Sequence, residues 1–273
     1  MTSVANLVDV WDAETFDEGL MAPLRSNADL VRSYIAADKD ISIQREASRG
    51  RLVYQSNAYA DRYHHFLENL GRQMELSTIR AWHYTRLTES EVDALKTTGL
   101  YLSTVETTRE RLDAQVTDGQ ISVEIANALF EASPLRDRQQ ADSRVNRFWM
   151  TSQPTAVDDD DVTLLLNNWG GEVVYFWLQD EYLERVVGGI GQPRVLELAV
   201  PLSATEHGYR AARAVLATFA RSLGCDTSYE SFDLCAIRPL GPEAVLAVHT
   251  EGEATFERIG KGYPTSFHPS VNT

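Results

Sequence analysis

Cysteine is scarce in this chain. Its 273 residues include two cysteines, Cys225 and Cys235. Small secreted domains depend on several disulfides, whereas proteins of a reducing compartment carry few cysteines. The count therefore excludes a disulfide scaffold. We expect both residues to be buried thiols in a cytoplasmic protein.

Long apolar runs are also missing. The longest, Gly170–Leu178, has the length of a strand, whereas a helix needs about 18 apolar residues to cross a bilayer. The stretch Met1–Leu20 lacks a basic start and an apolar core, and it carries several acidic residues. We therefore expect neither a membrane span nor a secretory signal.

Positive charge is in short supply. The chain has 25 lysines and arginines against 40 aspartates and glutamates, a formal net charge of −15. Such a field repels phosphate backbones over roughly 8–10 Å at physiological salt. Non-specific binding of nucleic acid is therefore not expected.

Several chemical motifs are absent. The chain has no P-loop, HExxH, CxxC or GxSxG pattern. Gly188–Gly191 lacks the spacing of a dinucleotide fingerprint and follows a predicted helix, so we interpret it as a connection to a strand. Asp158–Asp161 is interpreted as an acidic turn that caps a helix over 162–168, where negative charge suits the helix start. We therefore predict no metal site.

The sequence does contain intermixed helix and strand patterns. Residues 1–76 read as helical, with an apolar stripe over 58–74 and an expected loop over 38–51. Further helices are expected over 89–97, 107–138 and 209–223. Strands are expected over 77–87, 100–103, 147–152, 170–178, 194–200, 231–237 and 244–249, the last two as a hairpin.

This order lacks a steady strand–helix–strand rhythm and predicts an α+β fold with a mixed, mainly antiparallel sheet. We divide the chain into an N-terminal helical region (1–76), an α+β domain (77–259) and a C-terminal loop tail (260–273).

Three segments resemble the ADP-ribosyltransferase fold. The run RAWHYTRL (80–87), followed by a short helix and TGLYLST (98–104), is similar to that fold's opening, where a strand carries a His and then a Ser or Thr. RFWMTSQP (147–154) resembles its second motif. Tyr229-Glu230-Ser231 leads into a late strand, where the family carries its catalytic Glu. The run after Trp169 is also similar to uncharacterised bacterial domains related to that fold.

The resemblance implies an ADP-ribosyltransferase-like fold over about Ile79–Thr250, with NAD as the substrate. It makes Glu230 the catalytic residue, holding the 2′-hydroxyl of the reacting ribose. The remaining residues would contact NAD: His83 and Thr85 at the adenosine ribose, Thr151 and Ser152 at the nicotinamide, Trp149 or Tyr101 stacked on a ring, and Arg86 or Arg147 at the pyrophosphate.

The implied reaction is ADP-ribosyl transfer, or hydrolysis of NAD, with an unidentified acceptor that includes protein among the options. A second function stays open. Tyr84 stands where the family usually has a glycine, which favours a non-catalytic module that binds protein or nucleotide. A hydrolase that uses His83 with Asp233 or Glu230 ranks last, because no nucleophile motif accompanies it.

Overall fold

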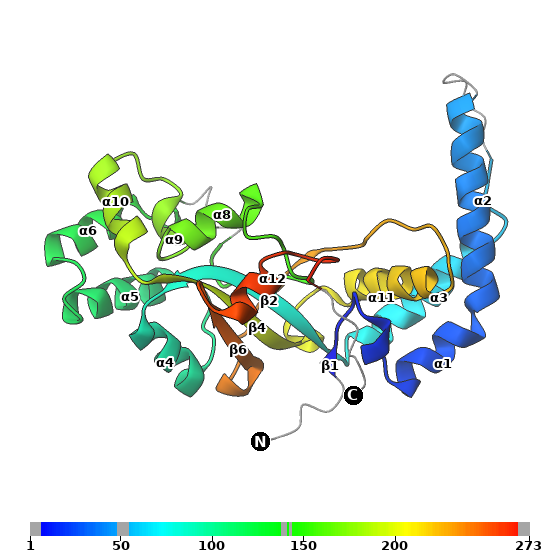
Figure 1. The fold of residues 1–273 in the computed structure, drawn as a ribbon, viewed down its shortest axis with the longest axis horizontal. Helices are drawn as coiled ribbons and strands as arrows, with labels where there is room; N and C mark the ends of the chain where they lie inside the picture. Colours follow the sequence, from blue (N-terminus) through cyan, green and yellow to red (C-terminus); the bar gives the residue numbers. More distant parts are fainter. Residues whose placement is uncertain (1–6, 48–54, 138–140, 142–143, 267–273) are drawn as a thin grey trace. The chain divides into compact units, whose positions relative to one another are not determined.

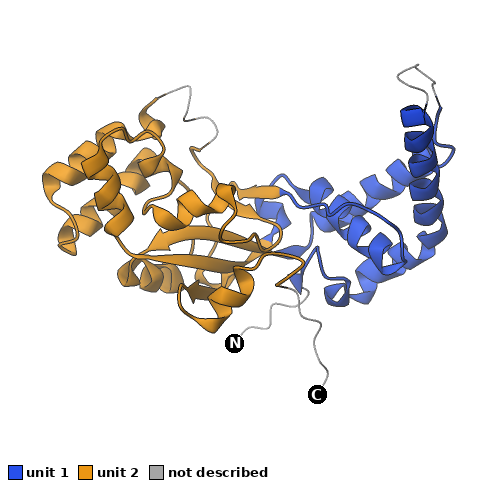
Figure 2. Cartoon of the chain, turned by 45° about the horizontal axis from the view of Figure 1, so that its top comes forward, with its two compact units in different colours: residues 1–79, 201–232 blue, residues 80–200, 233–273 orange. Residues whose placement is uncertain are grey.

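The computed structural model describes residues 7–47, 55–137, 141 and 144–266. The chain forms two compact units that interleave in sequence, one from Met1–Ile79 and Pro201–Phe232, the other from Arg80–Val200 and Asp233–Thr273 (Figure 2). The division expected at residue 76 lies near the first unit boundary, but the later segment 201–232 joins the N-terminal helices. We call these units 1 and 2.

Unit 1 is mainly helical. It contains β1 (Leu7–Val8), α1 (Glu18–Ser26), α2 (Ala28–Ala47), α3 (Ala60–Met74) and α11 (Gly208–Ser222), with short 3-10 turns at Ala13–Thr15 and Leu202–Ala204 (Figure 1). The loop expected over 38–51 was wrong as far as Ala47, because α2 continues through it; residues 48–51 lie outside the described part. That half of α2 is polar and carries no buried residue.

The core of unit 1 forms where α3 packs against α11. The predicted stripe of α3 is confirmed at Phe66, Leu67 and Leu70, which are buried, whereas Tyr59 is exposed. α11 contributes a face rich in alanine, with Val215 and Phe219 buried among the small residues. Small side chains on one helix let the larger ones of the other approach closely.

Unit 2 contains most of the sheet. Its elements are β2 (Thr78–Leu87, whose first two residues belong to unit 1), α4 (Glu89–Thr98), α5 (Val105–Thr117), α6 (Val123–Ala132), β3 (Phe148–Thr151), α8 (Asp160–Asn167), α9 (Glu172–Tyr175), α10 (Glu181–Gly189), β4 (Gln192–Pro201), β5 (Asp233–Ala236), β6 (Val245–Thr250) and α12 (Ala254–Ile259). 3-10 turns lie at Pro134–Arg136 and Pro242–Ala244.

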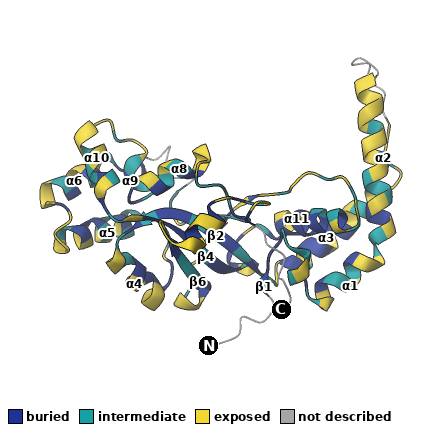
Figure 3. Cartoon of the chain, in the orientation of Figure 1, coloured by how far each residue is buried: buried dark blue, intermediate teal, exposed yellow. Residues whose placement is uncertain are grey.

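The strands run in the order β5-β3-β2-β4-β6. β3 pairs antiparallel with β2 and β5, and β6 pairs antiparallel with β4, while β1 pairs parallel with the first two residues of β2. The predicted α+β class with a mixed, mainly antiparallel sheet is confirmed. The central strands β2 and β4 are largely buried (Figure 3), which explains why their sequences show only weak alternation.

The prediction that the strands over 231–237 and 244–249 form a hairpin was wrong. β5 pairs with β3 and β6 pairs with β4, so the two strands lie at opposite edges of the sheet order. The connection contains Leu240, which forms a bridge with Leu100, and then the turn Pro242–Ala244. A connection of this length lets the chain cross the sheet, whereas a hairpin is typically closed by two to five residues.

The strand expected over 170–178 was also wrong. Gly170 and Gly171 both have positive φ, and the single helical turn α9 follows. Trp169 and Val174 are buried in a cluster with Leu112, Leu129 and Val187. A short apolar run cannot be assigned to helix or strand by periodicity alone, and here the packing of α9 in this cluster decides the outcome.

Other predicted boundaries changed in detail. The helix expected over 107–138 is two helices, α5 and α6, separated by Gly119 with a φ of 71° and by Ser122, which caps α6. The strand expected over 100–103 is limited to the bridge at Leu100. Asp159 caps α8 by accepting from the Asp161 amide, which confirms the acidic turn as a cap.

The C-terminal segment is described as far as Ser266, and Lys261 forms a bridge with Ala156. Of the two cysteines, Cys235 is buried as expected and Cys225 is partly exposed. Among the described helices, none combines the length and the apolar character that a membrane span requires.

Candidate functional site

His83 lies in the middle of β2, in unit 2. Its Nδ1 is 2.8 Å from the backbone oxygen of Trp149, and its ring centroid is 4.4 Å from that of Phe148. β2 and β3 share one registered pair, Trp82 with Thr151. Beyond that pair, the His83 side chain supplies a hydrogen bond from β2 to the backbone of β3.

This contact fixes the tautomer of His83. A carbonyl oxygen only accepts, so Nδ1 must carry the proton. Burial lowers the pKa of His83 to about 4, the hydrogen bond to Trp149 opposes the shift, and the positive charge of Arg111 adds to it. The ring is therefore neutral near pH 7. Its Nε2 then has a free lone pair that can accept a hydrogen bond from a hydroxyl group.

Thr85 follows His83 by two residues and is buried. Side chains two apart on a strand point to the same face, so His83 and Thr85 share one face of β2. Tyr84 points to the other face, where its hydroxyl donates to the Thr155 oxygen at 2.9 Å and accepts from the Thr155 amide. The bulky residue at the family's glycine position therefore points away from the His83 side.

Trp149 and Thr151 lie on the face opposite His83. Thr151 is paired directly with Trp82, and directly paired residues present their side chains on the same face. Alternation then places Trp82, Trp149 and Thr151 together, and His83 on the other side. Trp149 is 42% exposed. The geometry thus separates these two predicted residues from His83.

Both arginines expected at the pyrophosphate have other partners. Arg86 donates to the backbone oxygen of Ile190 at 2.7 Å and points to the Tyr84 face by alternation. Arg147 donates to the sulfur of Cys235 at 3.3 Å. Arg86 links the end of α10 to the sheet, and Arg147 links the start of β3 to β5.

Tyr101 and His83 are both influenced by the charge of Arg111. Burial of its hydroxyl raises the pKa of Tyr101, while Arg111 lowers it and Glu91 raises it. The side chain remains 40% exposed. The charge of Arg111 thus acts on both Tyr101 and His83.

Arg111 belongs to a buried network that the sequence analysis missed. Its guanidinium is 2.6 Å from Glu91, and the Trp169 indole donates to the same carboxylate at 2.8 Å. Glu91 also accepts from the Thr88 amide, which completes a capping box at the start of α4. The Thr88-x-x-Glu91 spacing was the one available signal. No sequence pattern pointed to Arg111.

A second network forms around Glu197 of β4. Glu197 bonds to Arg80 at 2.5 Å and to His249 Nε2 at 3.0 Å. Burial raises the pKa of Glu197, but the His249 hydrogen bond and the Arg80 charge outweigh it and hold the pKa below its usual value. Both carboxylate oxygens are engaged, so this network reads as structural.

Ser152 and Glu230 complete the predicted set. Ser152 is 1% exposed and directly follows β3. Glu230 belongs to unit 1, whereas the other predicted residues belong to unit 2. Within unit 1, Glu230 is 3.0 Å from Arg213 on α11. Its charge contributes to the raised pKa of Tyr63, after burial and Tyr34.

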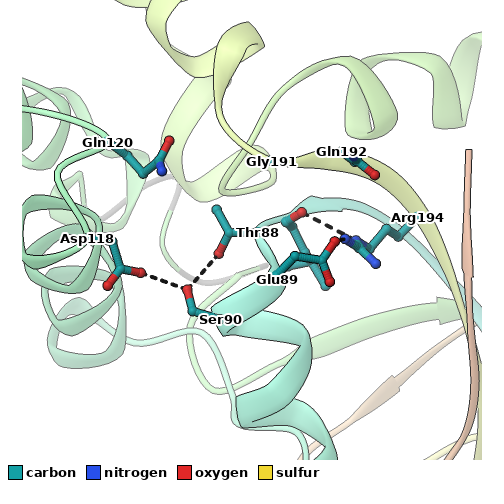
Figure 4. Close-up of a pocket in the computed structure, with 9 residues that line it drawn as sticks. Thr88, Glu89, Ser90, Asp118, Gln120, Gly191, Gln192 and Arg194 are labelled. Carbon is teal, nitrogen blue, oxygen red and sulfur yellow. Dashed lines mark hydrogen bonds and ion pairs between the residues drawn. The ribbon is translucent and has the colours of Figure 1, made fainter.

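A pocket of about 510 Å³ opens elsewhere in unit 2, where β2 ends and α4 and β4 begin (Figure 4). Its lining comprises Leu87, Thr88, Glu89, Ser90, Asp118, Gln120, Gly191, Gln192 and Arg194. None of the residues predicted to contact NAD lines this pocket. Among the described residues, no group of three or more His, Cys, Asp or Glu side chains is arranged to hold a metal ion.

Comparison of the chain with protein-family models, with curated proteins and with solved structures gives no match.

Proposed function

We propose that unit 2 binds NAD on the His83 face of β2, and that the protein cleaves the bond between nicotinamide and ribose to transfer ADP-ribose to an acceptor or to water. The observation that carries the proposal is the fixed, neutral imidazole of His83. Its Nε2 is an acceptor suited to a ribose hydroxyl, in a partly buried position on a strand.

The neighbours of His83 narrow the proposed binding set. Thr85 shares its strand face, and Tyr101 offers a partly exposed ring under the influence of the same arginine. Trp149, Thr151 and Arg86 point to the other face, and Arg147 is bonded to Cys235. The proposed NAD contacts are therefore His83, Thr85 and Tyr101. Ser152, which directly follows β3, stays in the proposed set.

The chemistry asks little acid catalysis of the protein. Nicotinamide leaves as a neutral molecule, and the transition state resembles an oxocarbenium ion, as in glycoside cleavage. A carboxylate that holds the ribose 2′-hydroxyl would stabilise the developing positive charge. We assign this part to Glu230 on the sequence resemblance alone.

The test of turnover uses NAD labelled in the nicotinamide ring. We expect wild type to release nicotinamide and Glu230→Gln to lose most of that release, while Glu206→Gln, also in unit 1, retains it. The proposal is overturned if the wild type releases no labelled nicotinamide, and equally if it does not bind NAD. Equal release by wild type and Glu230→Gln overturns the role of Glu230.

A second candidate function is a non-catalytic nucleotide-binding module. The ion pair between Arg213 and Glu230 favours it, because the carboxylate is already engaged within unit 1. This function predicts NAD binding that depends on His83, without release of nicotinamide from any variant.

A further inference from the structure

The pocket at the start of α4 is distinct from the His83 site, and its volume of about 510 Å³ lies within the usual range for ligand pockets. Its lining residues carry polar side chains except Leu87 and Gly191, and the surface that they expose to the pocket is shared between polar and apolar atoms. Ligand pockets are more often apolar with a few polar groups. This mixed lining therefore suits a ligand that carries several hydrogen-bonding groups together with apolar carbon surface.

The polar side chains are held in place before any ligand arrives. Ser90 donates to Asp118 at 2.7 Å, and the Thr88 and Ser90 hydroxyls are 3.0 Å apart. Glu89 pairs with Arg194 (Figure 4). Arg194 also donates to the Thr250 hydroxyl at 2.8 Å. Groups that are already ordered cost less conformational entropy when a ligand binds.

The same groups have hydrogen-bonding capacity left over. Arg194 is 3% exposed, and its bonds to Leu87, Thr250 and Glu89 use three N–H groups of the five that a guanidinium carries. Asp118 has a second oxygen beyond the one that Ser90 occupies. Gln120 and Gln192 also line the pocket, and their side-chain amides make no hydrogen bond to the described residues, so these amides add further donors and acceptors to the lining.

The charge of the lining excludes an anionic ligand. Glu89 and Asp118 give two negative charges against one positive charge on Arg194, and Glu89 already neutralises that guanidinium. A phosphate or carboxylate would compete with both carboxylates for the same donors. A neutral ligand that both donates and accepts at several positions meets no such penalty.

We infer that this pocket binds a neutral polyhydroxylated ligand, a saccharide of one or two rings. Each hydroxyl of such a ligand donates one hydrogen bond and accepts others. It can therefore use the spare N–H groups of Arg194, the free oxygen of Asp118 and the amides of Gln120 and Gln192. This ligand site is independent of the NAD site and shares no residue with it.

Saturation-transfer NMR and calorimetry test the inference with ribose, glucose, galactose, maltose and lactose as probes, and with inorganic phosphate in a separate arm. We expect at least one saccharide to bind, and Gln192→Ala and Asp118→Asn each to weaken it by about tenfold, the worth of one good hydrogen bond. Gln192 and Asp118 are exposed, so neither change threatens folding.

The matched controls are Gln179→Ala and Asp158→Asn, two exposed residues of unit 2 outside the lining. They should leave saccharide affinity unchanged. The inference is overturned if none of the saccharides binds, if pocket and control variants bind alike, or if phosphate binds in the pocket in their place. NAD binding should be the same in all four variants. If wild type binds a saccharide but does not bind NAD, that result contradicts the proposed function and leaves the saccharide site standing.

Discussion

The hydrogen bond from His83 to Trp149 determines which ring nitrogen carries the proton, and this one contact gives the residue its chemical character. The sequence supplied the residue and its place on a strand. It could not supply the tautomer, because the accepting carbonyl comes from a strand far away in the chain. Nor could it show that Thr151 faces away from His83, since that depends on the register with Trp82.

The depressed pKa of His83 predicts a pH-dependent stability. An unfolded histidine titrates near pH 6.5, whereas His83 in the folded state titrates near pH 4. Between these pH values the unfolded chain binds more protons than the folded chain. The contribution of His83 to the unfolding free energy is therefore complete above about pH 6.5 and is lost as the pH falls towards 4. The upper limit of this stability contribution is about 3 kcal/mol, since a pKa difference of one unit corresponds to roughly 1.36 kcal/mol.

The variant His83→Asn isolates this effect, because its side-chain amide can still donate to Trp149 but does not titrate. Urea denaturation at pH 7 and pH 4.5 should show a smaller loss of unfolding free energy for the variant than for wild type. Equal losses in the two proteins would contradict the depressed pKa.

Glu91 accepts hydrogen bonds from three residues, Arg111, Trp169 and Thr88, which makes it sensitive to a change of charge. In Glu91→Gln, an NH2 group would face the donors of Arg111, Trp169 or the Thr88 amide. Removing one partner of a buried ion pair leaves the other charge uncompensated, so we expect a loss of about 3 kcal/mol in unfolding free energy.

Chemical denaturation measures the unfolding free energies of Glu91→Gln and of a control variant, Glu110→Gln. Glu110 is an exposed glutamate on helix α5. The control should change stability by less than about 0.5 kcal/mol. Similar small effects for both variants would mean that the network contributes little.

At the scale of elements, strong local signals were predictive and short apolar runs were not. The helix predicted over 89–97 is confirmed as α4, with Thr88 as its cap and with Gly99, at a φ of 85°, directly after its end. The run 170–178 became a helical turn because Trp169 and Val174 pack among other helices. The partners of β5 and β6 depended on long-range pairing, which no local pattern encodes.

Gly191 joins α10 to β4 and approaches the end of β2. It has a φ of 67°, and a Cβ atom there would lie 2.5 Å from the carbonyl group of Leu87. Gly191→Ala should therefore lose about 3 kcal/mol, from the left-handed backbone and the steric overlap together. It should also disturb the adjacent saccharide pocket.

Gly189→Ala is the matched control, since a Cβ atom at Gly189 would meet nothing within 4 Å. Thermal unfolding should show a clear drop in Tm for Gly191→Ala and almost none for the control. Equal Tm values for the two variants would show that β4 can shift to accommodate the side chain.

In the whole molecule, the residues of the predicted site belong to two different compact units. His83 and the other residues proposed to contact NAD belong to unit 2, whereas Glu230 belongs to unit 1. Sequence reasoning could place Glu230 before a late strand, and β5 confirms that strand. Sequence reasoning could not detect that Pro201–Phe232 returns to the N-terminal helices. The amphipathic pattern of α11 predicts a buried face, but it does not identify α3 as the helix that covers this face.

Calorimetric titration of NAD into the whole chain and into His83→Asn measures whether His83 contributes to NAD binding. We expect wild type to bind NAD and His83→Asn to bind it about tenfold more weakly, because the variant removes the Nε2 acceptor and keeps the donor to Trp149. His65→Ala, at an exposed histidine of α3, should bind like wild type. No binding by wild type, or equal affinity of wild type and His83→Asn, would contradict the account.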